Sequence, residues 1–182
     1  MRQNTLRVCA LGAILLSGSL LALSASAQDE PRLVPEPADS KKLLPFLPEP
    51  PEGWKGELAE GSTDTLGDTQ ITTVHRDYMR GEGDALATTS ISILDSFANP
   101  EYVEATTGAW TSNTTDAEGF TKSITIDGLP GFETYENEGK HGSLWLVVAK
   151  RYILQIEVTA QESSELQEWL KRIDLKKLAE IK

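Results

Sequence analysis

Histidine and cysteine, which supply many acid–base, nucleophilic and metal-binding groups, number only three in this chain of 182 residues. Its two histidines are His75, among strand-forming residues, and His141, in a glycine-rich turn. No HxH, HxxxH or HExxH spacing provides a metal-binding pattern, so we expect solvated or hydrogen-bonded histidines. An acid–base site would require two or more members of one set to meet in a cleft: His75, Asp77, Glu133, Glu136 and His141.

Two other motifs partly resemble a calcium-binding loop and a hydrolase nucleophile, but each lacks required residues. Asp64 and Asp68 flank Gly67 like a loose calcium loop, but an EF-hand also needs ligands at alternate positions and a closing glutamate. His141-Gly142-Ser143 has no G-x-S-x-G context and no base placed to activate a nucleophile. The sequence therefore predicts no catalytic, cofactor-binding or metal-ligating residues, no cofactor, and a protein that is not an enzyme.

The N-terminus has the layout of a secretory signal peptide. Two arginines precede an apolar run over residues 10–23, and the small residues Ala25-Ser26-Ala27 follow. We expect a signal peptide over residues 1–27, cleavage after Ala27 and a periplasmic or secreted protein; an uncleaved anchor is the alternative. Because a bilayer span needs about 20 apolar residues, no membrane span is expected in the mature chain. Cleavage would also remove Cys9, the single cysteine.

The charge of the mature chain restricts its partners. After cleavage, 15 basic and 28 acidic side chains remain, a net charge of −13. This charge disfavours binding to nucleic acid or to anionic membrane surfaces. Basic residues gather over Lys171–Lys177, either as a solvated helix face or as a contact for an acidic surface such as the protein's own N-terminal leader.

Proline content divides the chain into three parts. Seven of the nine prolines lie between Pro31 and Pro51, which predicts a proline-rich leader over residues 28–53, following the signal peptide over 1–27. Within it, the apolar stretch over residues 43–47 is expected to dock on the folded domain. A single α+β domain is predicted over residues 54–182.

Strand and helix signals alternate within that domain. Runs of β-branched and aromatic residues predict strands over 70–78, 85–95, 120–126, 132–138, 144–149 and 152–158. Asn99-Pro100 predicts a capped helix start. Ser164 and Gln167 fit a capping box ahead of a C-terminal helix, and Asp174 can cap a last short helix. Residues 61–67 are interpreted as a polar turn.

The order of these elements favours an antiparallel sheet with helices packed on it, an α+β fold. Trp110, Trp145 and Trp169 lie at positions typical of a core. Trp54 lies where the leader meets the domain, so its role is structural or functional.

The pattern of elements over residues 43–182 resembles the PsbP-like superfamily, which includes bacterial periplasmic DcrB-like proteins. The resemblance rests on these segments: Leu43–Trp54, the Asn99-Pro100 helix, Gly128–Glu133, Ala149–Tyr152, Ser164–Ile173 and Asp174–Leu178. It implies an α/β/α sandwich with a central antiparallel sheet and a C-terminal helix packed on it. It also implies a binding or accessory role. None of the family's metal or partner-contact residues can be matched here, so none is transferred.

The sequence thus predicts a secreted, non-enzymatic accessory or binding domain whose partner is a protein or an envelope component. The alternative is a carrier or sensor of an apolar small molecule, held between sheet and helix near Trp110 or Trp145.

Overall fold

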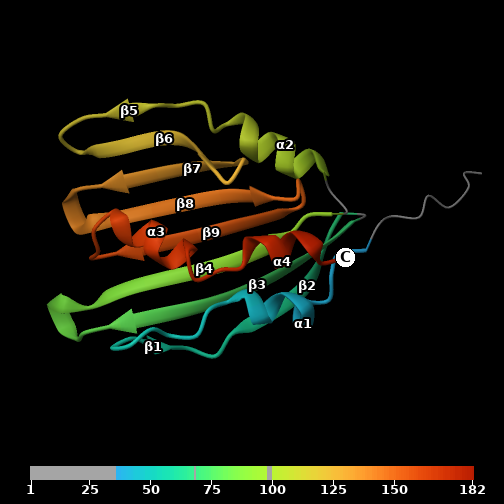
Figure 1. Ribbon diagram of the computed structural model, residues 1–182, viewed down its shortest axis with the longest axis horizontal. Coiled ribbons are helices and arrows are strands. Elements are labelled where there is room, and N and C mark those ends of the chain that lie inside the picture. Colours follow the sequence, from blue (N-terminus) through green and yellow to red (C-terminus); the bar gives the residue numbers. More distant parts are fainter. Residues whose placement is uncertain (1–35, 68, 98–99) are drawn as a thin grey trace, which may run out of the picture. The chain divides into compact units, whose positions relative to one another are not determined.

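A computed structural model of the protein describes residues 36–67, 69–97 and 100–182 (Figure 1). The predicted signal peptide over residues 1–27 and the predicted cap Asn99 lie outside the described residues. The described chain forms one antiparallel sheet of nine strands, accompanied by short helices. The α+β fold expected from the sequence is confirmed.

In chain order the strands are β1 (Lys55–Gly56), β2 (Glu60–Leu66), β3 (Thr69–Arg80), β4 (Ala87–Asp95), β5 (Thr114–Thr115), β6 (Gly119–Ile126), β7 (Leu129–Glu136), β8 (His141–Val148) and β9 (Tyr152–Thr159). The sheet has β3 and β4 towards one edge, β9 and β8 at its centre, and β7 and β6 towards the other edge. β2 pairs with β3 beside β1, so these two strands share one edge.

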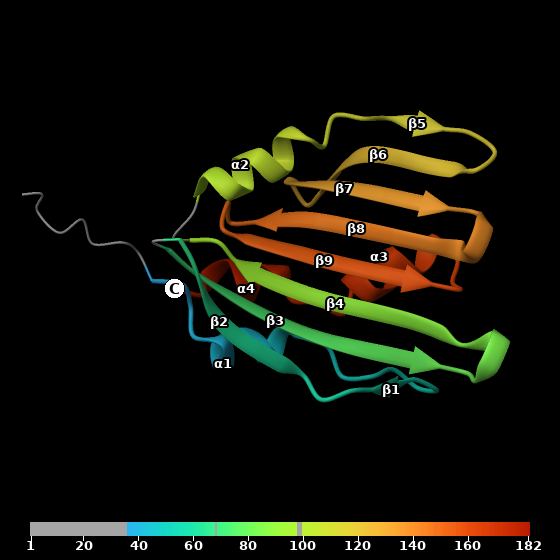
Figure 2. The ribbon, with the colours of Figure 1, turned by 180° about the vertical axis from the view of Figure 1, so that it is seen from behind.

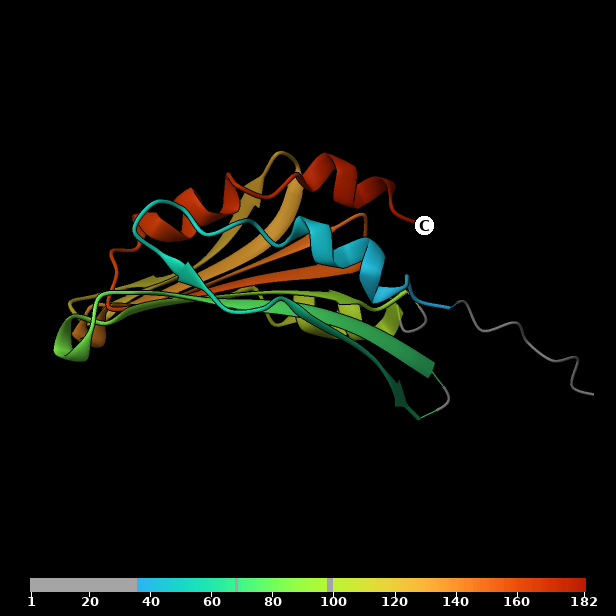
Figure 3. The same ribbon diagram turned by 90° about the horizontal axis from the view of Figure 1, so that it is seen from below.

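Helices lie on both faces of this sheet, but unequally. The helices are α1 (Ser40–Leu43), α2 (Pro100–Gly108), α3 (Ser164–Leu170) and α4 (Leu175–Glu180), with short 3-10 turns η1 (Leu44–Phe46), η2 (Gly83–Ala85) and η3 (Glu138–Lys140). Figure 3 shows α1, α3 and α4 above one face, called here the helix face, and α2 below the other, called the open face. The α/β/α order is therefore present, with a second helical layer that consists of α2 alone.

Alternation along the strands builds the main core on the helix face. Side chains of Ile91 and Ile93 from β4 meet Leu154 and Ile156 from β9, and all four are fully buried. A smaller cluster on the open face joins Val103 of α2 to Val147 and Ile153. β8 is thus covered on both faces near its end, which explains its nearly continuous apolar sequence.

The described part of the proline-rich leader takes part in this packing from Ala38 onward. Leu43 and Leu47 are at most 4% exposed and belong to the main core. The hydroxyl of Tyr78 donates a hydrogen bond to the Pro48 carbonyl at 2.7 Å. These leader side chains fill the helix face over β3, so the packing of the main core includes residues ahead of Trp54.

A buried ion pair joins four distant parts of the chain. Asp95, fully buried at the end of β4, accepts hydrogen bonds from the Arg151 guanidinium at 2.8 and 2.6 Å. The same carboxylate accepts from the backbone N–H of Ala38 and of Phe97. Arg151 also donates to the Ile181 carbonyl, so leader, sheet and C-terminus meet here.

Two local expectations were wrong. Residues 60–66 form β2 instead of a polar turn; these mostly Ser, Thr and Gly residues lack apolar alternation because the edge strand is almost wholly exposed. The capping box also fails: α3 is capped from Ser163, which makes no side-chain cap bond, and Gln167 bonds elsewhere. The cap of α4 is confirmed, since Asp174 accepts from the Lys177 N–H.

Leu43→Ala should lower the free energy of unfolding by about 3 kcal/mol, because it removes a fully buried side chain from the main core. Lys41→Ala on the same helix is the control and should change it by less than about 0.5 kcal/mol. Urea denaturation measures both. An equally small effect of the two substitutions would show that the leader is not docked.

Alkaline pH should destabilise the protein through Tyr78. Burial raises the pKa of Tyr78 to about 12, against the opposing effect of Arg76. A raised folded-state pKa means that the stabilisation is complete below about pH 10 and is lost as pH rises towards about 12. We expect the free energy of unfolding to fall by roughly 2 kcal/mol less between these pH values in Tyr78→Phe than in the wild type. Denaturation curves across this range measure it, and an unchanged pH profile in Tyr78→Phe would contradict the prediction.

Candidate functional site

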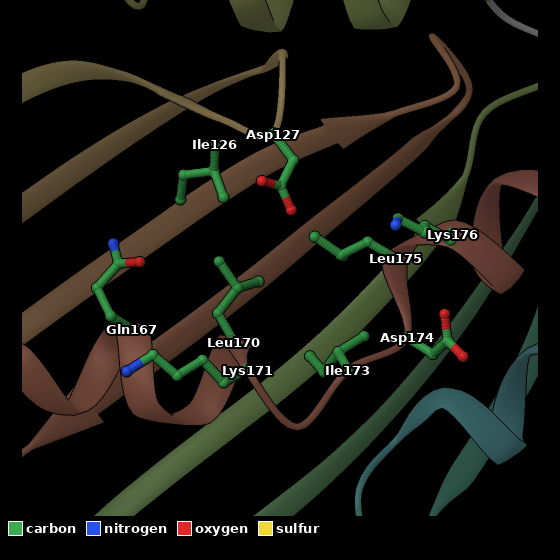
Figure 4. Close-up of a pocket in the computed structure, with 9 residues that line it drawn as sticks. All are labelled: Ile126, Asp127, Gln167, Leu170, Lys171, Ile173, Asp174, Leu175 and Lys176. Atoms are coloured by element: carbon green, nitrogen blue, oxygen red, sulfur yellow. The ribbon is translucent and has the colours of Figure 1, made fainter.

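A groove on the helix face lies between the turn after β6 and the segment joining α3 to α4. Its volume is about 370 Å³. Its apolar floor consists of Ile126, Leu170, Ile173 and Leu175, and its polar rim of Asp127, Gln167, Lys171, Asp174 and Lys176. Figure 4 shows Ile126 and Asp127 approaching from the sheet and Leu170 and Leu175 from the helices, all towards one space.

The sheet wall of this groove ends in a tight hairpin turn. Asp127 and Gly128 have φ values of +51° and +80° and directly connect the paired residues Ile126 and Leu129. Two consecutive residues with positive φ are typical of a two-residue type I′ turn, which suits Asp followed by Gly. The turn places the Asp127 carboxylate on the rim.

The helical wall is held to the sheet by a buried carboxylate. Glu133 of β7 is 3% exposed. One of its oxygens lies 3.0 Å from the Lys122 ammonium on the neighbouring strand, and the other accepts a hydrogen bond at 3.0 Å from the Gln167 amide nitrogen. Both oxygens are therefore engaged, and the pair anchors α3 over β7.

The five residues of the possible acid–base set do not come together as one group. Glu133 points to the helix face, whereas the other four side chains point to the open face. Glu136 and His141 lie opposite each other on β7 and β8. His75 and Asp77 are on β3, separated from β8 by two strands, or about 14 Å.

Each histidine has a polar neighbour of its own. His75 Nε2 lies 3.9 Å from a Glu60 carboxylate oxygen, and His141 Nδ1 lies 3.2 Å from the Thr159 hydroxyl. The Asp64 carboxylate accepts from the Ser62 hydroxyl at 2.8 Å, while Asp68 is outside the described residues. In residues 36–67, 69–97 and 100–182, no group of three or more His, Cys, Asp or Glu side chains could hold a metal ion.

The tryptophans divide between the two faces. Trp169, 2% exposed, packs on the helix face against Tyr78 at 4.7 Å, with Trp54 edge-on at 5.1 Å. The Arg80 guanidinium lies 4.7 Å from the centre of the Trp54 ring. Trp54 therefore packs at the edge of the core, next to the leader. On the open face, the Phe132 ring lies 6.2 Å from both Trp110 and Trp145. The groove is thus on the face opposite to the two tryptophans near which the sequence placed a ligand.

Most of the basic residues over Lys171–Lys177 have partners within their own helices. Lys171 pairs with Glu168, and Lys177 pairs with Asp174 at 3.2 Å. The Arg172 guanidinium lies 5.7 Å from the Trp169 ring. Lys176 lines the groove instead.

The groove residues were not found by sequence reasoning, although several signals were present. The sequence predicts only a helix cap for Gln167 and gives no role to Asp127. Nothing in the sequence indicates that this turn and the segment after α3 adjoin, because the two are about 45 residues apart.

Comparison with known proteins adds no relative: no family model, curated protein or solved structure matches the chain. The PsbP-like resemblance stays a sequence-based expectation. In the described part of the chain, no helix has the length and hydropathy needed to cross a bilayer.

Proposed function

We propose that this protein is a secreted, periplasmic and non-enzymatic accessory domain that binds a protein or envelope partner through the open face of its sheet. The observation that carries the proposal is the unequal covering of the sheet: three helices lie on the helix face and α2 alone lies at one end of the open face (Figures 2 and 3). Most of the open face of the sheet is thereby left accessible to a partner.

The uncovered part of this face is polar but not fully solvated. One row across the strands contains Ser92 of β4, Gln155 of β9 and Trp145 of β8, all half-buried. The next row contains Ser90 and Thr134, also half-buried. Hydroxyl and amide groups held at fixed spacing provide hydrogen bonds to a partner, and the neighbouring aromatic rings provide apolar area.

Charge on this face favours a cationic partner. Strand alternation and register place five carboxylates on it, those of Glu60, Asp64, Asp77, Glu136 and Glu157. Lys55 on β1, at the corner of the sheet, is the one lysine that the described strands direct to this side. Such a surface attracts basic protein segments and repels nucleic acid and anionic lipid.

Site-specific photo-crosslinking in the native host tests this proposal. A photoreactive amino acid at Ser92 or Thr134 should join the protein to the same partner, because both positions lie on the open face. The same probe at Lys41 or Ala179, exposed among the helices of the other face, is the control and should give no such adduct. Equal adducts from all four positions, or none from the first two, would contradict the proposal.

A second candidate function, a carrier or sensor of an apolar small molecule, is supported by the groove. Its 370 Å³ falls within the ~300–1,000 Å³ of small-molecule sites, and its floor is apolar. This candidate places the ligand between β6–β7 and α3–α4.

Native mass spectrometry of the freshly purified full chain should then show a bound small molecule. Leu175→Trp, which fills the groove, should remove the added mass, whereas Ala179→Trp on the exposed side of α4 should retain it. An unliganded wild-type spectrum, together with a groove that binds no added ligand, would exclude the carrier function.

A further inference from the structure

The buried Glu133 determines which end of the Gln167 amide faces the groove. An ionised carboxylate only accepts hydrogen bonds, so the Gln167 NH2 group must point to Glu133, as the 3.0 Å contact shows. The amide oxygen is then directed away from Glu133, and Figure 4 shows it turned towards the groove. Lys122 holds Glu133 in turn, so this acceptor is fixed in place before any ligand binds.

Two oppositely charged side chains on the rim are not used by the fold. Lys171 is paired with Glu168, and Asp174 caps α4, where the hydrogen bond from the Lys177 backbone N–H lowers the pKa of the Asp174 carboxyl. The side chains of Asp127 and Lys176, in contrast, have no hydrogen-bond or ion-pair partner among the described residues. They come from opposite walls, Asp127 from the β6–β7 turn and Lys176 from α4.

The groove therefore combines three features that select one class of ligand. Asp127 and the Gln167 oxygen are acceptors suited to an ammonium group, which has three donors. Lys176 is suited to a carboxylate. Between them lies a floor of Ile and Leu side chains, on which an aliphatic or aromatic body is removed from water.

We infer that this groove binds a zwitterion with an apolar side chain: an apolar amino acid or a short apolar peptide. The ligand ammonium lies at Asp127 and Gln167, its carboxylate at Lys176, and its side chain on Ile126, Leu170 and Leu175. The rim has two acids and two lysines, so a ligand with one charge of each sign leaves no charge uncompensated. The inference rests on the second candidate function and names its ligand.

Matched ligands test the requirement for both charges. The wild-type chain is titrated at millimolar concentrations with L-leucine, with 3-methylbutylamine, which lacks the carboxylate, and with 4-methylpentanoate, which lacks the amine. NMR amide shifts locate the site and give the affinity. Leucine should bind at least about tenfold more tightly than either analogue, since each analogue lacks one of the two charged groups that the rim residues bind. The shifts should centre on Asp127, Gln167 and Lys176.

Matched variants test the two rim residues. Asp127→Asn keeps a residue that tolerates positive φ, and Lys176→Gln keeps an unbranched, helix-forming polar residue on α4. Each should weaken leucine binding about tenfold or more without shifting the thermal midpoint. Asp84→Asn, in the turn before β4, and Lys41→Gln, on α1, remove the same charges elsewhere and should leave affinity unchanged.

The possible results distinguish failure of the zwitterion assignment from failure of the carrier function. Equal binding of the three ligands, or equal loss in rim and control variants, would overturn the zwitterion assignment and leave an apolar carrier. Absence of any shift at the groove with all three ligands and with the dipeptide Leu-Leu would overturn the assignment. A small molecule still seen by native mass spectrometry would then keep the carrier function. Neither result bears on partner binding by the open face.

Discussion

The ion pair between Asp95 and Arg151 is the interaction on which the arrangement of the helix face depends. A fully buried carboxylate is stable only if its hydrogen-bonding capacity is met, and here the guanidinium and two backbone N–H groups meet it. Since one of those groups belongs to Ala38, the carboxylate is fully hydrogen-bonded only when the leader is in place, and Arg151 extends the network to the Ile181 carbonyl near the C-terminus. The two ends of the described chain therefore close over the same core.

The hydrogen-bond requirement of a second buried carboxylate, Glu133, shapes the groove. Glu133 needs donors on both oxygens and obtains them from Lys122 and Gln167. By doing so it fixes α3 over β7 and turns the Gln167 oxygen outward. Strand alternation meanwhile sorts charge between the faces: on β3, Arg76 goes to the helix face, where it bonds the Pro48 carbonyl, and Asp77 goes to the open face. One sheet thus carries a mixed, apolar-floored groove on one side and an acidic polar surface on the other.

Local patterns predicted those elements whose stability is local. Six strand regions, the helix at Pro100 and the cap by Asp174 were recovered because alternation, a proline at the helix start and an N-cap act within a few residues. Local patterns gave wrong predictions where a residue distant in the sequence determines the interaction. Gln167 gives its amide to Glu133, 34 residues away, instead of a helix cap. β2 has no apolar face, and its pairing with β3 rests on backbone hydrogen bonds, which the sequence does not display.

The sequence by itself thus determined the α+β class, the acidic charge and the small number of histidines and cysteines, because composition and periodicity are properties of the chain. Only the tertiary structure decided that the leader belongs to the core from Ala38, that four of the five suspected acid–base groups lie apart from Glu133 on the opposite face, and that Asp127 and Lys176 border one groove. The reason is physical: which side chains meet depends on strand order and on the partners that buried Asp95 and Glu133 require, and neither is encoded in local spacing.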